Sequence, residues 1–276
     1  MSSFDGALGA AILALALVGA VFAAWISPQN PYDMASLSVL DSLMPPGSTA
    51  MNGMVMHLGS DEMGRDVFSA MLYGLRISLF VAVTATGIAL IIGTIAGLTA
   101  AYAGGRVDAA LMRLVDLQLS FPSMLIALVL MAAFGTGLDK VIVAIIASQW
   151  AYFARTIRGS AVIERRKEYI QAAQVLGYSR LRIVAVHLLP NSIGPLAVVA
   201  TVEMAGAISL EATLSFLGLG LPVTQPSLGL LISNGFSLLI TGQYWAAIFP
   251  GLLLMLLLVG FNLFGERLRK LTERSA

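Results

Sequence analysis

Six apolar runs, each of about the 20 residues that a helix needs to cross a bilayer, divide this chain and leave little room for any other architecture. They cover roughly residues 7–26, 77–101, 117–135, 138–157, 193–216 and 244–264. Of the 276 residues, 58% are hydrophobic and only 11% are charged, which is too apolar for a soluble globular domain. The sequence therefore predicts an all-α integral membrane protein with six transmembrane helices.

The placement of Lys and Arg indicates which side of the membrane each loop faces, because cytoplasmic loops carry an excess of positive charge. With the N-terminus in the cytoplasm, only Arg65, Arg76 and Lys140 fall on the outer side, and every other Lys and Arg is cytoplasmic. A seventh apolar run, residues 228–240, is too short to span the membrane, so an interfacial or re-entrant helix is expected there. Both termini are thus predicted to be cytoplasmic.

This topology divides the chain into four parts. Residues 1–26 form the first transmembrane helix, 27–75 an extracytoplasmic loop ending in a short interfacial helix, 76–265 a core with five transmembrane helices, and 266–276 a cytoplasmic tail. Asp66 is suited to cap the interfacial helix, which is expected to begin at Val67. In the second run Gly93, Gly97 and Ala101 recur at every fourth position, which predicts close packing of another helix against this face.

A polar, Arg-rich segment, residues 168–190, separates the fourth and fifth runs on the cytoplasmic side. Its first part carries an apolar stripe at helical spacing, formed by Tyr169, Ala172, Ala173 and Leu176. Gly177 is expected to end this helix as a left-handed cap residue, and Ser179 to begin a second helix that lasts until Pro190. The segment is therefore predicted to form a helix–turn–helix unit, which suits docking of another protein better than chemistry.

This segment resembles the EAA loop of the permease subunits of ABC importers. The resemblance rests on the triplet Gln171-Ala172-Ala173, on Gly177 four residues later, and on the pair Leu189-Pro190. In that family the loop docks on a cytoplasmic ATPase, which implies the same role for residues 158–190, here called the coupling loop. The implied coupling residues are Glu168, Gln171, Ala172, Ala173, Gly177, Arg180, His187, Leu189 and Pro190. Gln171 stands where the family has Glu, so it is assigned no ionic role, and an ordinary amphipathic cytoplasmic loop is the alternative.

Two further stretches point to one branch of that family. The first comprises residues 58–66, LGSDEMGRD, together with 73–79, YGLRISL, and the second is LSFLGLG at residues 214–220. They resemble the C-type member of the permease pair in dipeptide, oligopeptide and nickel importers. The resemblance implies a type I ABC-importer permease fold with cytoplasmic coupling helices. It also implies peptides as the cargo, with nickel or another solute as the alternative.

The same resemblance implies the partners of the chain and its location. The partners are a second homologous permease subunit that completes a heterodimer, two cytoplasmic ATPase subunits that bind ATP and Mg²⁺, and an extracytoplasmic substrate-binding protein. The location is the bacterial cytoplasmic (inner) membrane. Independently, none of Lys140, Lys167 and Lys270 follows a glycine, so the sequence contains no Gly-Lys-Ser or Gly-Lys-Thr phosphate loop. We therefore expect no enzyme activity, catalytic residue or cofactor in this chain, and no nucleic-acid partner.

Two carboxylates lie in the fifth apolar run, where an ionised group is costly unless it is paired or hydrated. Glu203 and Glu211 are candidates for the translocation path, where Glu203 would attract the ammonium group of a peptide. For Glu203 the alternative is an interhelical hydrogen bond. Ion coupling through these residues would suit a secondary transporter or channel instead, and a non-transporting scaffold is a third class.

Near the outer membrane surface, Arg65 and Asp66 are candidates for docking of the binding protein, with an internal salt bridge as the alternative. No metal site is expected. The chain has no cysteine, and its two histidines, His57 and His187, fall on opposite sides of the membrane in the predicted topology.

Overall fold

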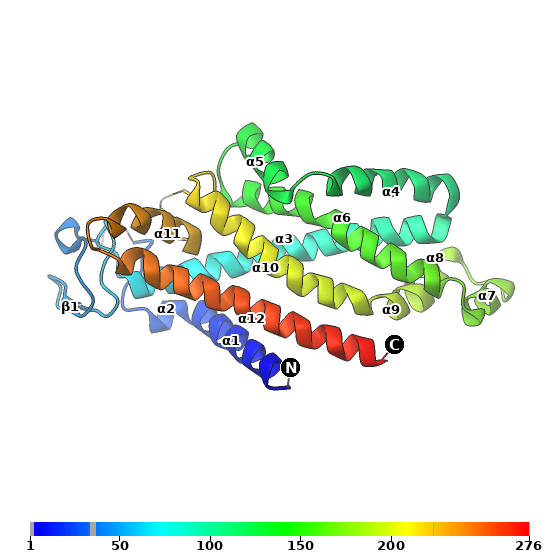
Figure 1. The fold of residues 1–276 in the computed structure, drawn as a ribbon, viewed down its shortest axis with the longest axis horizontal. Coiled ribbons are helices and arrows are strands. Elements are labelled where there is room, and N and C mark those ends of the chain that lie inside the picture. Colours follow the sequence, from blue (N-terminus) through cyan, green and yellow to red (C-terminus); the bar gives the residue numbers. More distant parts are fainter. Residues whose placement is uncertain (1–2, 34–36, 223, 276) are drawn as a thin grey trace.

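Helices make up almost all of the regular structure in the computed structural model, which describes residues 3–33, 37–222 and 224–275 (Figure 1). The long helices are α1 (Ser3–Val21), α3 (Val67–Ala103), α4 (Gly105–Leu119), α5 (Ser123–Phe134), α6 (Leu138–Glu164), α10 (Gly194–Phe216) and α12 (Trp245–Ser275). The shorter ones are α2 (Ala23–Ile26), η2 (Val39–Asp41), α7 (Glu168–Val175), α8 (Arg180–Arg182), the π-helix η3 (Ile183–Leu188), α9 (Leu189–Ser192), α11 (Leu228–Phe236) and η4 (Ser237–Leu239). The all-α prediction is confirmed.

All six expected apolar runs are helical over most of their length. Within the described part of the chain, three helices are each long and apolar enough to cross a membrane, namely α3, α10 and α12 over Trp245–Thr272. A fourth is gained if α4 and α5 count as one bent span. Three to four helices of the described residues thus have the length and composition of membrane spans, against the six that the sequence predicts.

The expected third span, residues 117–135, is not one straight helix. α4 and α5 are bent by 86° at residues 120–122. Pro122 has no N–H for a helical hydrogen bond and disfavours helical geometry in the residue before it, so the helix ends there. α4 turns back along α6, where Arg158 pairs with Asp108 at 2.7 Å and Arg155 pairs with Asp116.

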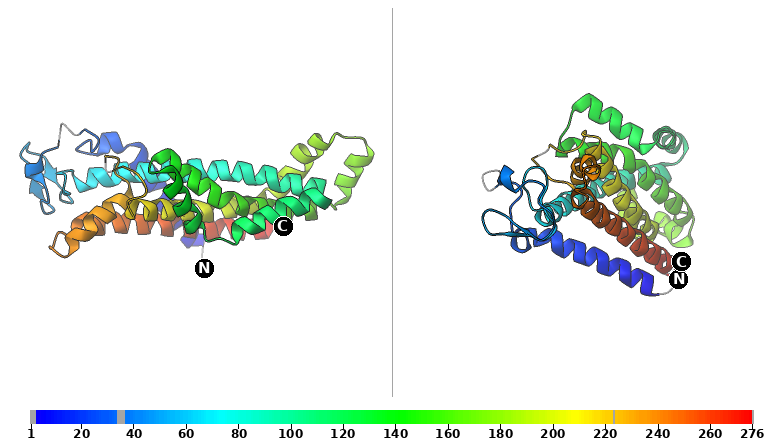
Figure 2. Two further views of the ribbon diagram at one scale, coloured as in Figure 1. Left: turned by 90° about the horizontal axis from the view of Figure 1, so that it is seen from above. Right: turned by 60° about the vertical axis from the view of Figure 1, so that its left-hand side comes forward.

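The long helices run between two opposite ends of the molecule (Figures 1 and 2). One end carries residues 27–33 and 37–66, with a small antiparallel hairpin of β1 (Ser48–Thr49) and β2 (Val55–Met56). The other end carries α7 and α8; α12 ends toward it, whereas α1 begins near the middle of the long axis. α3 begins at Val67 and continues without a break, so the short interfacial helix expected at the end of the outer loop is the first part of α3. α11 is short, in agreement with the expectation for residues 228–240.

Close packing of α3 on α6 confirms the role expected of the small residues in the second run. A Cβ added to Gly93 would lie 2.4 Å from the carbonyl oxygen of Trp150. One added to Gly97 would lie 2.3 Å from the carbonyl oxygen of Ala154. The two backbones therefore touch where only glycine fits.

We expect Gly97→Ala to destabilise the protein by about 1–3 kcal/mol, because the added methyl group overpacks the contact between α3 and α6. Gly87→Ala in the same helix is the matched control, since a Cβ there has no atom within 4 Å. The thermal midpoints of the purified variants are the measurement. Equal midpoints for both variants would contradict this packing argument.

Candidate functional site

The turn of the coupling loop has the geometry that its sequence predicts. Gly177 has a φ of +77°, in the left-handed region. The N–H of Tyr178 donates to the carbonyl of Ala173 at 3.1 Å, and the N–H of Gly177 donates to that of Gln174 at 3.0 Å. These two bonds form a Schellman motif, which satisfies carbonyls at the end of α7. Ser179 then caps α8 by accepting from the N–H of Arg182 at 3.3 Å.

The buried face of the coupling loop differs from the expected one. Ile170 and Ala173 of α7 are buried together with Ile183 of η3, and Tyr102 at the end of α3 packs against them. Of the expected stripe only Ala173 is inside, whereas Tyr169, Ala172 and Leu176 are exposed. The sequence did not predict that Ile170, three residues before Ala173, is buried. Ile183, on the returning segment of the loop, covers that side of α7.

Polar contacts fasten the coupling loop to the long helices. Arg165 donates to the carbonyl of Ala101 at 2.9 Å, and its guanidinium lies 5.4 Å from the ring centroid of Tyr102. The Tyr169 hydroxyl donates to Glu164 at 2.5 Å. Partial burial, together with this bond to a carboxylate, raises the pKa of Tyr169 to about 12. These contacts brace the loop against α3 and α6.

Aromatic stacking closes the turn between α7 and η3. The rings of Tyr178 and His187 stack at a centroid distance of 5.9 Å, and the guanidinium of Arg182 lies 4.4 Å from the Tyr178 centroid. Asn191 donates to the carbonyl of His187 at 2.7 Å. His187 thus packs inside the turn, while Arg180 and Pro190 are exposed and Leu189 is half-buried.

The outer surface of the coupling loop is apolar at its tip. Val175 is 88% exposed and Leu181 is 79% exposed, and Leu176 is exposed between them. Glu168, Gln171 and Ala172 are also exposed on α7, where the amide of Gln171 donates to the carbonyl of Arg166 at 3.1 Å. Large apolar side chains that are exposed together often belong to a surface that binds another protein. The sequence motif pointed to the alanines and Gly177, and missed Val175 and Leu181.

A second candidate site is a polar cavity of about 350 Å³ between α6 and α10, next to the start of α5. Its polar lining residues are Ser123, Ser148, Gln149, Tyr152, Glu203, Ser209 and Thr213. The amide of Gln149 donates to the backbone carbonyl of Glu203 at 2.7 Å, and Thr86 of α3 donates to Gln149 at 3.1 Å. The structure therefore places Glu203 at an open cavity between α6 and α10 that several polar side chains line.

Glu211, in contrast, is not on this cavity. Its side chain is completely buried. The hydroxyl of Ser78 on α3 donates to one carboxylate oxygen at 2.8 Å, and that of Ser215 on α10 donates to the other at 2.8 Å. In this structure two helices enclose the carboxylate of Glu211, which makes an interhelical hydrogen bond and lines no cavity surface there.

Arg65 and Asp66 also lie inside the protein. Arg65 is 1% exposed and its Nε lies 2.6 Å from a carboxylate oxygen of Asp61. Asp66 caps α3 by accepting from the N–H of Ser69 at 2.7 Å, and its own N–H donates to Gln29 at 2.7 Å. Arg65 therefore makes an internal salt bridge, as in the alternative, whereas Asp66 serves as the cap of α3.

Comparisons with known proteins agree with the long-helix architecture. The family model "Binding-protein-dependent transport system inner membrane component" matches residues 89–274. The chain is similar to the probable D,D-dipeptide transport system permease protein DdpC of Escherichia coli (strain K12), at 35% identity over 97% of this chain and 86% of the relative. It is also similar to the oligopeptide transport system permease protein OppC of Bacillus subtilis (strain 168), at 34% identity over 95% of this chain and 83% of that one.

Among solved structures, a chain of the inward-facing MetNI methionine ABC transporter matches with a TM-score of 0.59 at 17% identity, over 74% of this chain and 96% of that one. A chain of an amino acid ABC transporter matches with a TM-score of 0.52 at 15% identity, over 74% and 94% of the two chains. The likeness shows that the fold is that of a type I ABC-importer permease. Because the family model matches residues 89–274, the chain belongs to the inner membrane components of binding-protein-dependent transport systems.

Proposed function

We propose that this chain is one of two permease subunits of an ATP-driven importer and forms half of a translocation path for dipeptides or oligopeptides. The peptide cargo is supported by relatives named as dipeptide and oligopeptide permeases, which align over nearly the whole chain. The branch resemblance includes nickel importers, so nickel or another solute is the alternative cargo for the same machinery.

The coupling loop is the observation that carries this proposal. Its tip of Val175, Leu176 and Leu181 projects apolar side chains from one end of the molecule, while its inner face is braced on α3 and α6. The chain has no phosphate loop of its own. We infer that two cytoplasmic ATPase subunits bind ATP and Mg²⁺ and hold this tip, and that this chain supplies no cofactor or catalytic group.

Movement of the coupling loop would act directly on the polar cavity. The loop joins α6 to α10, and these two helices provide Gln149 and Glu203 at the cavity wall. Because the loop is braced, closure of the ATPases would move it as a rigid lever and shift α6 against α10. ATP binding would then favour the state of the path in which the ATPase subunits bind ATP more tightly.

The remaining parts of the assembly follow from the two ends of the molecule. We place the coupling loop and both termini in the cytoplasm, since the basic residues gather there, and residues 27–66 outside, facing an extracytoplasmic binding protein. The membrane is the bacterial inner membrane. A second homologous permease completes the path as a heterodimer. In this arrangement residues 1–26 form a first transmembrane segment, residues 27–75 the outer loop region, residues 76–265 the core and residues 266–276 the tail.

Reconstitution of the complete transporter in lipid vesicles tests the proposal. We expect peptide uptake that requires ATP and the binding protein, and that is lost when the ATPase subunits are catalytically inactive. Uptake that persists with inactive ATPases would favour an ion-coupled secondary transporter, for which Glu203 at the cavity is the specific observation. Stimulation of ATP hydrolysis by Ni²⁺ but not by peptides would indicate that the cargo is nickel. No cargo-dependent stimulation at all would favour a scaffold.

We expect Glu203→Gln to lower the rate of peptide uptake several-fold, because the cavity loses the charge that attracts the peptide ammonium group. Ser209→Ala, which removes another polar group from the same wall, is the matched control and is expected to have a smaller effect. The measurement is initial uptake in vesicles that contain equal amounts of transporter. Wild-type uptake by the Gln variant would remove Glu203 from the path.

A further inference from the structure

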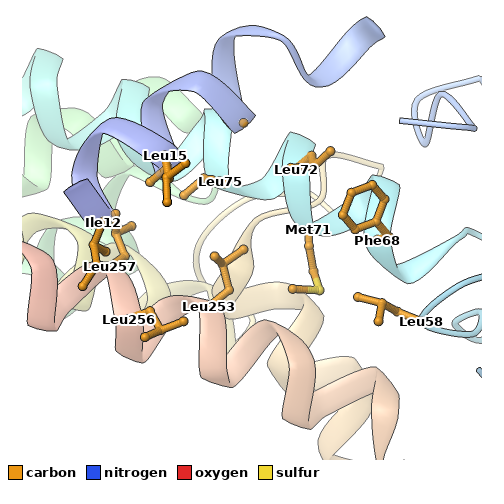
Figure 3. A pocket seen from close by; sticks show the side chains of 12 residues that line it. Ile12, Leu15, Leu58, Phe68, Met71, Leu72, Leu75, Leu253, Leu256 and Leu257 are labelled. Atoms are coloured by element: carbon orange, nitrogen blue, oxygen red, sulfur yellow. The ribbon is translucent and has the colours of Figure 1, made fainter. Parts of the chain in front are cut away.

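The helices α1, α3 and α12 enclose an apolar groove that the proposed transport mechanism does not use (Figure 3). Its volume is about 340 Å³. The walls are formed by Ile12 and Leu15 of α1, Leu72 and Leu75 of α3, and Leu253 and Leu256 of α12. This space, here named the tail groove, is separate from the polar cavity that Glu203 lines.

The tail groove exists because α1 packs on α12 near its N-terminal end and on α3 further along. Close to its N-terminal end it touches the backbone of α12, where a Cβ added to Gly9 would lie 2.8 Å from the nitrogen of Phe264. Further along it faces α3, where a Cβ added to Gly19 would lie 3.3 Å from Cδ2 of Leu72. The groove is the wedge between these two contacts, which α1 leaves open as it crosses.

One end of the tail groove lies near the membrane–water interface. Leu58 of the outer loop, with Phe68 and Met71 at the start of α3, closes the groove on the side of residues 27–66. Trp25, in α2 at the same end of α1, is largely exposed, and exposed Trp residues gather at the interface of a bilayer. The groove therefore extends from about the level of the head groups into the hydrocarbon of the adjoining leaflet.

The chemistry of the tail groove selects hydrocarbon. All the side chains that line it are apolar, so a water molecule would find no hydrogen-bond partner among them. Leu15 and Leu256 are also exposed, so the groove opens sideways to the surroundings of the bundle. For helices that cross a membrane those surroundings are acyl chains, and Leu252 and Met255 continue the same apolar surface beyond the groove.

We propose that the tail groove holds one acyl chain of a phospholipid, which fastens α1 to α3 and α12. The chain gains close contacts on three sides there, whereas a lipid on an open helix face gains them on one side. This lipid is consequently retained when loosely held lipids exchange or are washed away. The inference does not depend on which cargo the importer carries.

Counting the lipids that stay with the intact transporter tests this proposal, by native mass spectrometry after purification from a phospholipid membrane. Leu256→Trp fills the groove, and Met255→Trp is the matched control on the adjacent residue of α12, outside the groove; the two side chains are 47% and 52% exposed. We expect wild type and Met255→Trp to retain equal numbers of phospholipids and Leu256→Trp to retain one fewer. Equal numbers in all three proteins would overturn the proposal.

A second measurement keeps the proposal testable if Leu256→Trp does not assemble. The wild-type transporter is placed in nanodiscs of phospholipids with brominated tails, and its density map is determined. We expect elongated density with the added scattering of bromine between Leu72 and Leu256. A helix of the second permease seated in the groove, or a groove without such density, would overturn the proposal. Either result leaves the peptide-import assignment intact, since that assignment is tested by uptake.

Discussion

Replacing Gly177 by valine is expected to lower peptide uptake at least tenfold while ATP hydrolysis by the partner subunits continues. Gly177 has a φ of +77°, and a β-branched residue held in that region costs about 1–3 kcal/mol. The turn can relieve this strain by giving up the bonds from Tyr178 and Gly177 to α7. Val175 and Leu181 would then no longer be held in fixed positions relative to each other, and the ATPase would no longer bind a rigid coupling loop.

Gly177→Asn is the matched control for this effect. Asparagine tolerates the left-handed region better than other residues with a Cβ, and at this exposed position a Cβ meets no atom within 4 Å. We therefore expect the Asn variant to retain most of the uptake. The measurement is uptake and ATP hydrolysis by both variants in the same reconstituted vesicles. Normal uptake by the Val variant would refute the role of this turn in coupling.

Glu211→Ala is expected to have the largest effect on stability, roughly 3 kcal/mol or more. The substitution removes the shared acceptor of Ser78 and Ser215 at a fully buried position, and each buried group left unsatisfied costs about 1–3 kcal/mol. It also leaves a void between α3 and α10, which adds the cost of a cavity. The expected result is a strong fall in the thermal midpoint and in the yield of assembled protein.

Glu211→Gln separates the hydrogen bonds from the charge. The amide keeps the shape and one acceptor oxygen, and a serine hydroxyl can accept from the amide nitrogen as well as donate. We expect the Gln variant to stay close to wild type in thermal unfolding. If the Gln and Ala variants were equally unstable, an ionised carboxylate and not the hydrogen-bond network would be the requirement.

The apolar runs were enough to predict the helices of the bundle, because a backbone in hydrocarbon has to satisfy its hydrogen bonds internally. They were not enough to predict the path of each helix. Residues 117–135 are apolar almost throughout, yet the chain bends by 86° at residues 120–122. Pro122 explains where the helix breaks, but the direction is set by the packing of α4 along α6, including the ion pair of Arg158 with Asp108.

The coupling loop shows the same limit on a smaller scale. Gly177 and Ser179 predicted where one helix ends and the next begins, because cap residues act through bonds to their near neighbours. The buried face was predicted wrongly, since Ile170 became an inner residue only through contact with Ile183 and Tyr102. The exposed Val175 and Leu181 were overlooked for the same reason, as apolar residues are assigned to the inside unless the fold is known.

The sequence by itself determined the class of protein, the turn at Gly177 and the family resemblance, because these depend on composition and on residues a few positions apart. The tertiary structure alone decided that Glu203 lines a cavity while Glu211 is enclosed between Ser78 and Ser215. Both carboxylates lie on the same helix, so no local rule separates them. Their environments differ because α3, α6 and α10 meet there, and such contacts join residues that are distant along the chain.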